Sequence, residues 1–149
     1  MAINPDFRDL LCEFNAHDVR YLVVGGYAFS FHAKPRFTKD LDVWVDPVDS
    51  NAVRVWDALA AFGAPLTELS RDDLAEPGTI FQIGLPPNRI DVLTVLEGVA
   101  FDEAWLQRVV GNYGDQSVPF LSREHLVRNK RAVGRTQDLA DAEALEQLD

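Results

Sequence analysis

The chain has 149 residues, of which 47% are hydrophobic and 26% charged, and its formal net charge is −10. This length fits one domain over residues 1–149, with enough apolar residues for a buried core. A membrane-spanning segment is excluded, since the longest mostly apolar stretch, residues 21–33, falls short of the roughly 20 apolar residues that a span needs.

Helix and strand patterns alternate along the first half of the chain. Apolar residues recur at the spacing of an amphipathic helix over residues 6–17, and the wholly apolar run over 21–24 is typical of a buried strand. The expected elements are a helix over 6–17, a strand over 21–24, a short helix over 27–33, a strand over 41–45 and a helix over 51–62. Asp49 or Ser50 can cap the last of these helices.

The second half contains a hairpin followed mostly by helices. Two β-rich runs are joined by Pro86-Pro87-Asn88, which favours an antiparallel hairpin. The expected elements are a helical turn over 71–75, strands over 79–85 and 89–96, a helix over 101–110, a strand over 117–120, a helix that Ser122 caps and Gly134 ends, and a helix over 136–148. This order predicts an α/β (α+β) domain with a small mixed β-sheet flanked by helices and a helical C-terminus.

The first motif with chemical content is Gly25-Gly26, where the buried strand runs into a helix. Glycines let the backbone approach a ligand closely, and the N–H groups that open a helix attract phosphate. Strand-Gly-Gly-helix is also a common way to turn a chain, so the motif alone does not define a phosphate site.

Two carboxylates, Asp40 and Asp42, stand two residues apart at the start of the next strand. Side chains alternate in a strand, so both project to one face while Leu41 and Val43 face the core. Two like charges this close raise one another's pKa, and a divalent cation removes that conflict. Oxygen-only ligation favours Mg²⁺ or Mn²⁺. The alternative is a solvated strand end without a ligand.

A third acid, Asp91, lies inside an otherwise apolar strand. An unpaired carboxylate there is costly, so either it pairs with a base such as Arg89 or Arg36, or it joins the metal site. Three carboxylates from two strands could hold two ions, which lie roughly 3.5–4 Å apart in two-metal phosphoryl-transfer sites.

These motifs, taken in order, resemble the DNA polymerase beta type nucleotidyltransferase superfamily. Gly25-Gly26, then Arg36-Phe37-Thr38-Lys39-Asp40-Leu41-Asp42, then Asp91 are especially similar to its small prokaryotic members. These members include abortive-infection toxin nucleotidyltransferases and minimal nucleotidyltransferases that act as antitoxins. The segment from Lys130 to Asp141 is similar to their closing segment. The resemblance covers most of residues 20–145 and implies the nucleotidyltransferase fold.

The resemblance also implies an activity. The expected enzyme uses Mg²⁺ or Mn²⁺ to move a nucleoside monophosphate from a nucleoside triphosphate (NTP) to a hydroxyl on an RNA end, a protein or a small molecule. A toxin–antitoxin or abortive-infection system is one setting for it. The implied catalytic and metal-binding residues are Asp40, Asp42 and Asp91, and the implied nucleotide-binding residues are Gly25, Gly26, Lys130 and Arg36.

Two other functions stay open at this point. Many members of the superfamily carry Ser after the first Gly, and its hydroxyl bonds a phosphate, whereas Gly26 supplies only backbone here. This departure and the short chain favour a catalytically weak or inactive nucleotide-binding module, which acts as an antitoxin or a partner-binding subunit. In the third interpretation, the acids form a divalent-ion site without a nucleotide.

The expected compartment is the cytoplasm. The single cysteine, Cys12, excludes an internal disulfide, and the start of the chain carries acids where a secretory leader is basic. The expected partners are an NTP and an acceptor such as a tRNA or a toxin protein, with no membrane. The acidic charge disfavours long nucleic acids held by electrostatics alone, because such binding relies on a basic surface.

Overall fold

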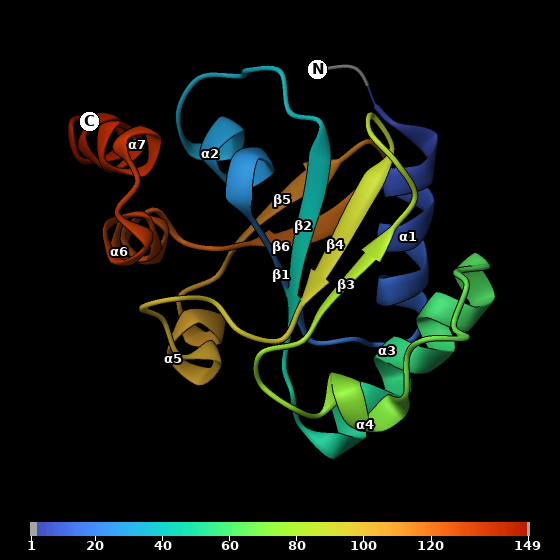
Figure 1. The fold of residues 1–149 in the computed structure, drawn as a ribbon. Helices are drawn as coiled ribbons and strands as arrows, with labels where there is room; N and C mark the ends of the chain where they lie inside the picture. The colour runs from blue at the N-terminus through green and yellow to red at the C-terminus, as the bar shows by residue number, and fades with distance from the viewer. Residues whose placement is uncertain (1–2, 149) are drawn as a thin grey trace.

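The computed structural model describes residues 3–148, and Figure 1 shows how the elements are arranged. In chain order the elements are α1 (Pro5–Ala16), β1 (Tyr21–Val24), α2 (Gly25–His32), β2 (Asp40–Val45), α3 (Asp49–Phe62), α4 (Arg71–Leu74), β3 (Ile80–Ile83), β4 (Arg89–Leu93), α5 (Phe101–Leu106), β5 (Val109–Tyr113), β6 (Gln116–Phe120), α6 (Arg123–Val133) and α7 (Thr136–Glu146).

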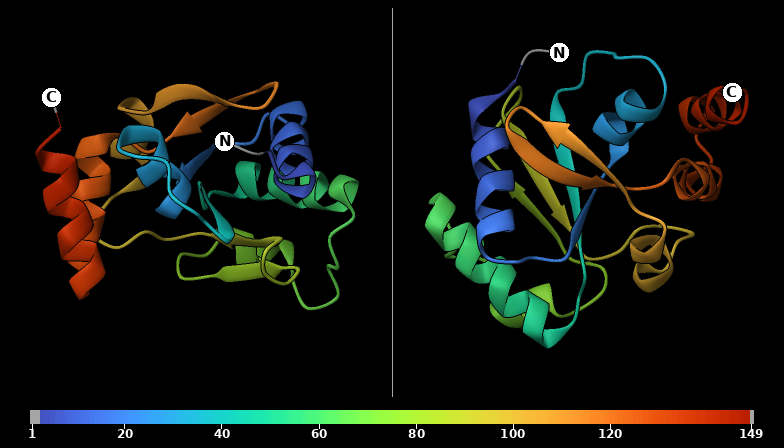
Figure 2. Two further views of the ribbon diagram at one scale, coloured as in Figure 1. Left: turned by 90° about the horizontal axis from the view of Figure 1, so that it is seen from above. Right: turned by 180° about the vertical axis from the view of Figure 1, so that it is seen from behind.

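The strands form one mixed sheet in the order β3-β4-β2-β1-β6-β5. Strand β2 runs antiparallel to β1 and parallel to β4, and the β3–β4 and β5–β6 hairpins form the two ends of the sheet. Helices α1 and α3 pack against one face, whereas α2 lies over the other face with α6 and α7 beside it (Figure 1 and Figure 2). The predicted fold class, a mixed sheet flanked by helices, is confirmed.

The main hydrophobic core lies between the sheet and helices α1 and α3. Because side chains alternate along β2, Leu41 and Val43 are buried in this core while Asp40 and Asp42 face the other way. Large buried side chains of the core include Phe7, Leu10, Leu11, Phe14, Tyr21 and Leu59. The face of β2 opposite the core carries Asp40 and Asp42 at the start of the strand and the buried Trp44, which packs on Phe101, further along.

Capping explains where several helices begin and end. The Ser122 side chain accepts a hydrogen bond from the backbone N–H of His125, and Gly134 ends α6 in the left-handed conformation, as predicted. The predicted cap of α3 is wrong. That helix begins two residues earlier than predicted, at Asp49, and its N-cap is Val48, which has no side chain that can accept a hydrogen bond.

The predicted helix over 101–110 is wrong in its second half. Helix α5 ends at Leu106, and Val109–Tyr113 forms strand β5, which pairs antiparallel with β6. Two adjacent β-branched residues, Val109 and Val110, favour an extended chain. Gly114, with φ of +61°, makes the turn into β6. The hairpin partner thus overrides the helical pattern.

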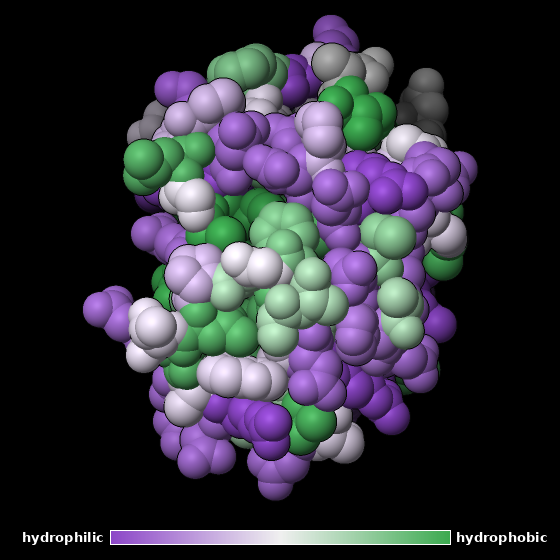
Figure 3. All heavy atoms as spheres, turned by 90° about the vertical axis from the view of Figure 1, so that its right-hand side faces the viewer, coloured by the Kyte–Doolittle hydropathy of each residue, from purple (hydrophilic) through white to green (hydrophobic). Residues whose placement is uncertain are grey.

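One side of the molecule, formed by α1, α3 and β3, is mostly polar, with apolar side chains gathered toward the β3 edge (Figure 3). Ile80 on β3 is 61% exposed, and Leu85, two residues after the end of β3, is 79% exposed. No helix within residues 3–148 has the length and hydrophobicity needed to cross a bilayer.

Candidate functional site

The acids of β2 and β4 lie on one face of the sheet. The two strands are parallel neighbours, in which Asp42 is in register with Asp91 and Asp40 with Arg89. Residues in register on adjacent strands project to the same face. The structure therefore brings the three predicted acids together from segments about a third of the chain apart, and we call Asp40, Asp42, Asp91 and Arg89 the acid cluster.

The glycine turn lies directly beside Asp42. Gly25 has φ of +66°, and a Cβ atom placed on it would lie only 2.3 Å from Asp42 Oδ2. Helix α2 begins at Gly25 itself, two residues earlier than predicted, and its N-cap Val24 makes no side-chain hydrogen bond to the first turn. An uncapped helix N-terminus favours an anion, because its N–H groups and the helix dipole both attract negative charge.

Arg89 lies between Asp40 and Asp91. Its Nη2 atom is 2.9 Å from Asp40 Oδ2 and donates a hydrogen bond of 3.2 Å to Asp91 Oδ2. Its Nε atom is 3.2 Å from Asp91 Oδ1. Two buried oxygens lack a hydrogen bond: Asp40 Oδ1, and Asp91 Oδ1, whose contact with Arg89 Nε is ionic only. Three carboxylates thus share one guanidinium, which leaves the acid cluster short of positive charge.

This shortage shows in the acidity of Asp42. The pKa of the Asp42 carboxyl is raised to about 7, first by burial and then by the nearby charges of Asp91 and Asp40, against the opposing effect of Arg89. A perturbed carboxyl beside further carboxyls and a helix N-terminus is typical of a functional site.

The donor set of the acid cluster suits a divalent cation. It consists of carboxylate oxygens alone, and two of these are buried without a hydrogen bond. Such a set of oxygen ligands favours Mg²⁺ or Mn²⁺. Within residues 3–148, no group of three or more His, Cys, Asp or Glu side chains is already placed as the ligands of a metal ion. Arg89 contacts the two outer acids instead.

Arg36 and Lys130 lie in a second ionic cluster, where α6 and α7 meet the loop before β2. Arg36 donates two hydrogen bonds of 2.9 Å to Asp141, and Lys130 Nζ lies 3.1 Å from Asp141 and 3.6 Å from Asp138. Arg135 also pairs with Asp138, at 2.6 Å. We call these five residues the α6–α7 cluster. The structure thus places Arg36 and Lys130 on Asp141 rather than on the acid cluster.

Burial opposes ionisation of Asp141, but hydrogen bonds from Arg36, Lys130 and Gln137 hold its pKa at about 2. No motif in the sequence assigns a role to Asp141. Its signal was the spacing of Asp138 and Asp141, which lie three residues apart and so share one face of a helix beside the basic helix α6.

Thr38 is a second residue whose position the sequence did not reveal. A Cβ atom placed on Gly26 would lie 2.6 Å from Thr38 Cγ2 and 3.2 Å from Thr38 Oγ1. The Thr38 side chain therefore fills the space that a side chain at position 26 would need, and its hydroxyl stands beside the glycine turn.

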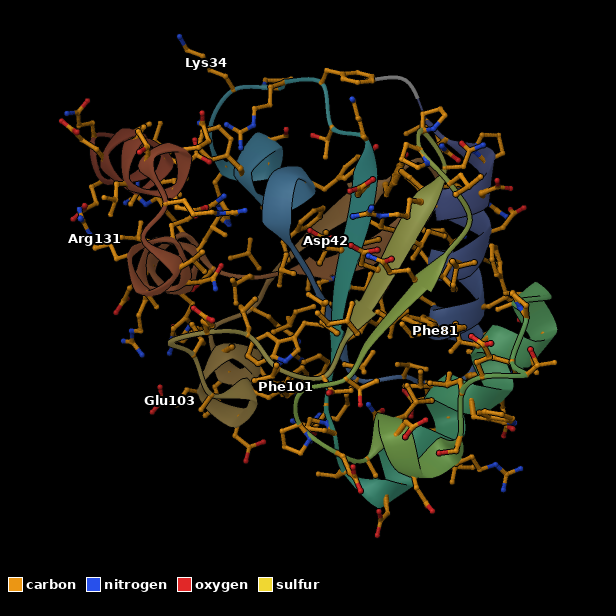
Figure 4. All side chains as sticks on the ribbon, in the orientation of Figure 1. Lys34, Asp42, Phe81, Phe101, Glu103 and Arg131 are labelled. Atoms are coloured by element: carbon orange, nitrogen blue, oxygen red, sulfur yellow. The ribbon has the colours of Figure 1, made fainter. Side chains whose placement is uncertain are left out.

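Figure 4 shows the position of the site among the charged side chains. Asp42 lies on β2 beside α2, whereas Lys34 and Arg131 lie at the periphery, away from Asp42, and Arg131 pairs with Glu146. The basic residues near the motifs are therefore not all directed at one site.

Comparisons with known proteins place this geometry in a known fold. No protein-family model matches the sequence, and no curated protein matches it. The solved structure of the lincosamide antibiotic adenylyltransferase LnuA, with lincomycin bound, is similar over 100% of both chains, with a TM-score of 0.63 and 15% identity.

Two further solved structures are similar. One is TM1012 from Thermotoga maritima, assigned as a nucleotidyltransferase, with a TM-score of 0.58 and 16% identity over 98% of this chain and 94% of that one. The other is an antigenic nucleotidyltransferase-like protein from Paracoccidioides brasiliensis, with a TM-score of 0.52 and 16% identity over 91% of this chain and 71% of that one. At these identities the likeness establishes the architecture: the chain has the nucleotidyltransferase fold.

Proposed function

We propose that this protein is a Mg²⁺- or Mn²⁺-dependent nucleotidyltransferase, which moves a nucleoside monophosphate from an NTP to a hydroxyl acceptor. The observation that carries this proposal is the convergence of Asp40, Asp42 and Asp91 on one face of the sheet, with Asp42 in contact with the Gly25 turn. Carboxylates next to an anion-binding turn are what the transfer of a charged phosphoryl group requires.

Asp40, Asp42 and Asp91 would hold the metal. When bound, the divalent ion would neutralise charge on the phosphates. The carboxylates would fix where the triphosphate lies, because they project from two hydrogen-bonded strands whose other faces are anchored in the core. This rigidity suits a reaction that depends on positioning and charge neutralisation.

Gly25 and Gly26 would bind the β- and γ-phosphates through the first N–H groups of α2. Without side chains, these residues let phosphate oxygens approach the backbone. The Thr38 hydroxyl, beside Gly26, donates to the Arg36 carbonyl at 3.3 Å and would turn to a phosphate when a nucleotide binds, as the side-chain donor that a serine provides in many members of the superfamily. The Gly26 backbone and the Thr38 hydroxyl together would then supply the phosphate contacts that one serine makes in those members.

Lys130 and Arg36 would contribute positive charge toward the triphosphate as part of the α6–α7 cluster. That cluster holds three cations and two carboxylates, so one positive charge is left over. The surplus supports an electrostatic role for the two residues, even though each is paired with Asp141.

For the acceptor we propose a hydroxyl on a small molecule. The net charge of −10 opposes a long polyanion as the acceptor. LnuA, whose structure contains lincomycin, is named as an adenylyltransferase for lincosamide antibiotics.

A second candidate is a non-catalytic nucleotide-binding module, such as an antitoxin. The position of Arg89 favours it, because a guanidinium already lies between two of the acids. One experiment separates the two candidates. The protein is incubated with each labelled NTP, Mg²⁺ or Mn²⁺, and a panel of hydroxyl compounds, and transfer is followed by mass spectrometry.

We expect label transfer by the wild type and a loss of at least about 100-fold in Asp42→Asn, since charge stabilisation of this kind has that magnitude. Asp57→Asn, on the exposed face of α3, is the matched control and should keep full activity. Equal label transfer by the wild type and Asp42→Asn would contradict the proposal that the acid cluster catalyses the transfer. Tight nucleotide binding without transfer would select the non-catalytic module.

A further inference from the structure

We propose that Arg89 is a built-in counter-ion of the acid cluster, which competes with a divalent cation for Asp40 and Asp91 and leaves them when the cation binds. This inference rests on the proposed function, because it concerns the same carboxylates. It assigns Arg89 a part in controlling metal affinity.

The contacts of Arg89 carry the competition. Its guanidinium meets both outer acids, at 2.9 Å for Asp40 Oδ2 and 3.2 Å for Asp91 Oδ2. A Mg²⁺ ion lies about 2.0–2.1 Å from its oxygen ligands, so an ion on these oxygens would be close to a group of the same charge sign. The ion and the guanidinium therefore cannot share the two carboxylates without strong repulsion.

Arg89 also has a route away from the acids. It is the first residue of β4, directly after the hairpin loop over 84–88, and its side chain is 32% exposed. The next residue, Ile90, is buried in the core on the opposite face and holds the strand in place. The guanidinium can thus swing into solvent while the backbone and Asp91 stay where they are.

The charge balance gives the exchange its direction. Three carboxylates converge with one guanidinium, and two buried carboxylate oxygens have no hydrogen-bond partner. Replacing one positive charge by two improves the balance, so a divalent ion can displace Arg89. The same guanidinium stabilises the cluster when no ion is bound. Arg89 should therefore weaken metal binding and strengthen the metal-free fold.

The test measures Mn²⁺ binding by titration calorimetry and electron paramagnetic resonance, with thermal unfolding in EDTA as the second readout. Three variants of the full chain are compared: Arg89→Gln, Arg89→Lys and Arg54→Gln. Arg54 is an exposed residue of α3, so Arg54→Gln makes the same change in net charge away from the acids.

We expect Arg89→Gln to bind Mn²⁺ about tenfold more tightly than the wild type, which corresponds to about 1.4 kcal/mol, and to unfold at a lower temperature in EDTA. Arg89→Lys keeps the charge but loses the paired hydrogen bonds, so it should shift both readouts in the same direction by less. It also serves as the test if Arg89→Gln does not fold. Arg54→Gln should match the wild type in both readouts.

Two results would overturn the counter-ion role, and they differ in what they say about the proposed function. Mn²⁺ affinity in the two Arg89 variants that equals or falls below that of the wild type removes the competition but leaves the enzyme intact, provided that Asp42→Asn loses Mn²⁺. If the wild type and every variant fail to bind Mn²⁺ at millimolar concentration, the metal site itself is wrong, and the label-transfer experiment should fail with it.

Discussion

The acid cluster and the α6–α7 cluster both bury charged side chains, but their charges are balanced in opposite ways. In the α6–α7 cluster every carboxylate has cationic partners, and the pKa of Asp141 is held at about 2. In the acid cluster Arg89 pairs with Asp40 and Asp91, and the pKa of Asp42 is raised to about 7. A cluster whose carboxylates are all paired with cations holds helices in place, whereas one that lacks positive charge is prepared for a ligand.

The largest expected effect is a loss of folding stability when the ion pairs of the α6–α7 cluster are removed. Asp141→Asn leaves Arg36 and Lys130 without their shared carboxylate, and breaking a buried pair costs about 3–5 kcal/mol. Chemical denaturation at pH 7 should show this loss, whereas Glu143→Gln, on the exposed side of α7, should change stability little. A wild-type denaturation midpoint for Asp141→Asn would show that the cluster does not hold α6 and α7 together.

In the acid cluster, Asp42→Asn should instead increase folding stability when no metal is bound. The pKa of Asp42 rises from an ordinary value of 3.8 to about 7 in the folded state, so ionisation of its carboxyl opposes folding. In EDTA the destabilisation grows as the pH rises from about 4 to 7 and is complete above 7. Asp42→Asn should therefore be more stable than the wild type by about 2 kcal/mol at pH 8 and by less at pH 5. A stability difference between Asp42→Asn and the wild type that does not change with pH would contradict the raised pKa of Asp42.

Gly25→Ala tests whether the glycine turn belongs to the acid cluster. A Cβ at Gly25 would meet Asp42 Oδ2, and the backbone there has φ of +66°, which costs a non-glycine residue about 1–2 kcal/mol. Gly63→Ala is the matched control, because Gly63 also has a positive φ, of +94°, but a Cβ there would meet nothing within 4 Å. Both variants should lose stability, and only Gly25→Ala should also lose Mn²⁺ binding. Equal Mn²⁺ affinity in both would separate the turn from the acids.

The smallest effect is expected for the Thr38 hydroxyl. Thr38→Val keeps the shape that packs on Gly26 but removes the donor, so nucleotide affinity should fall about fivefold, the value of one hydrogen bond. Thr38→Ser should keep most of the affinity. Titration calorimetry with a non-hydrolysable nucleotide and Mn²⁺ measures both, and unchanged affinity in Thr38→Val would exclude the hydroxyl from phosphate binding.

Local pattern predicted much of the acid cluster. The alternation of side chains in a strand placed Asp40 and Asp42 on one face, and the hairpin before Asp91 was also expected. The parallel pairing of β2 with β4 was not predictable, because it joins segments that are far apart in the chain. The register of that pairing is what sets Asp91 beside Asp42.

Tertiary contacts decided the remaining differences. Val109 and Val110 follow a helical pattern in sequence, but they pair with β6 because the hairpin satisfies their backbone groups. The sequence offered Arg89 as one of two partners for Asp91, but it could not show that the same guanidinium also reaches Asp40. That contact depends on the register of two strands.

The guanidinium between the outer acids has a consequence for the life of the protein in a cell. Many small metal-binding domains cannot fold until their ion binds, because the free energy of binding supplies the free energy of folding. A chain that brings its own cation can finish folding as it leaves the ribosome, whatever the supply of free ions. A shortage of Mg²⁺ or Mn²⁺ would then stop catalysis without unfolding the protein and exposing it to proteolysis.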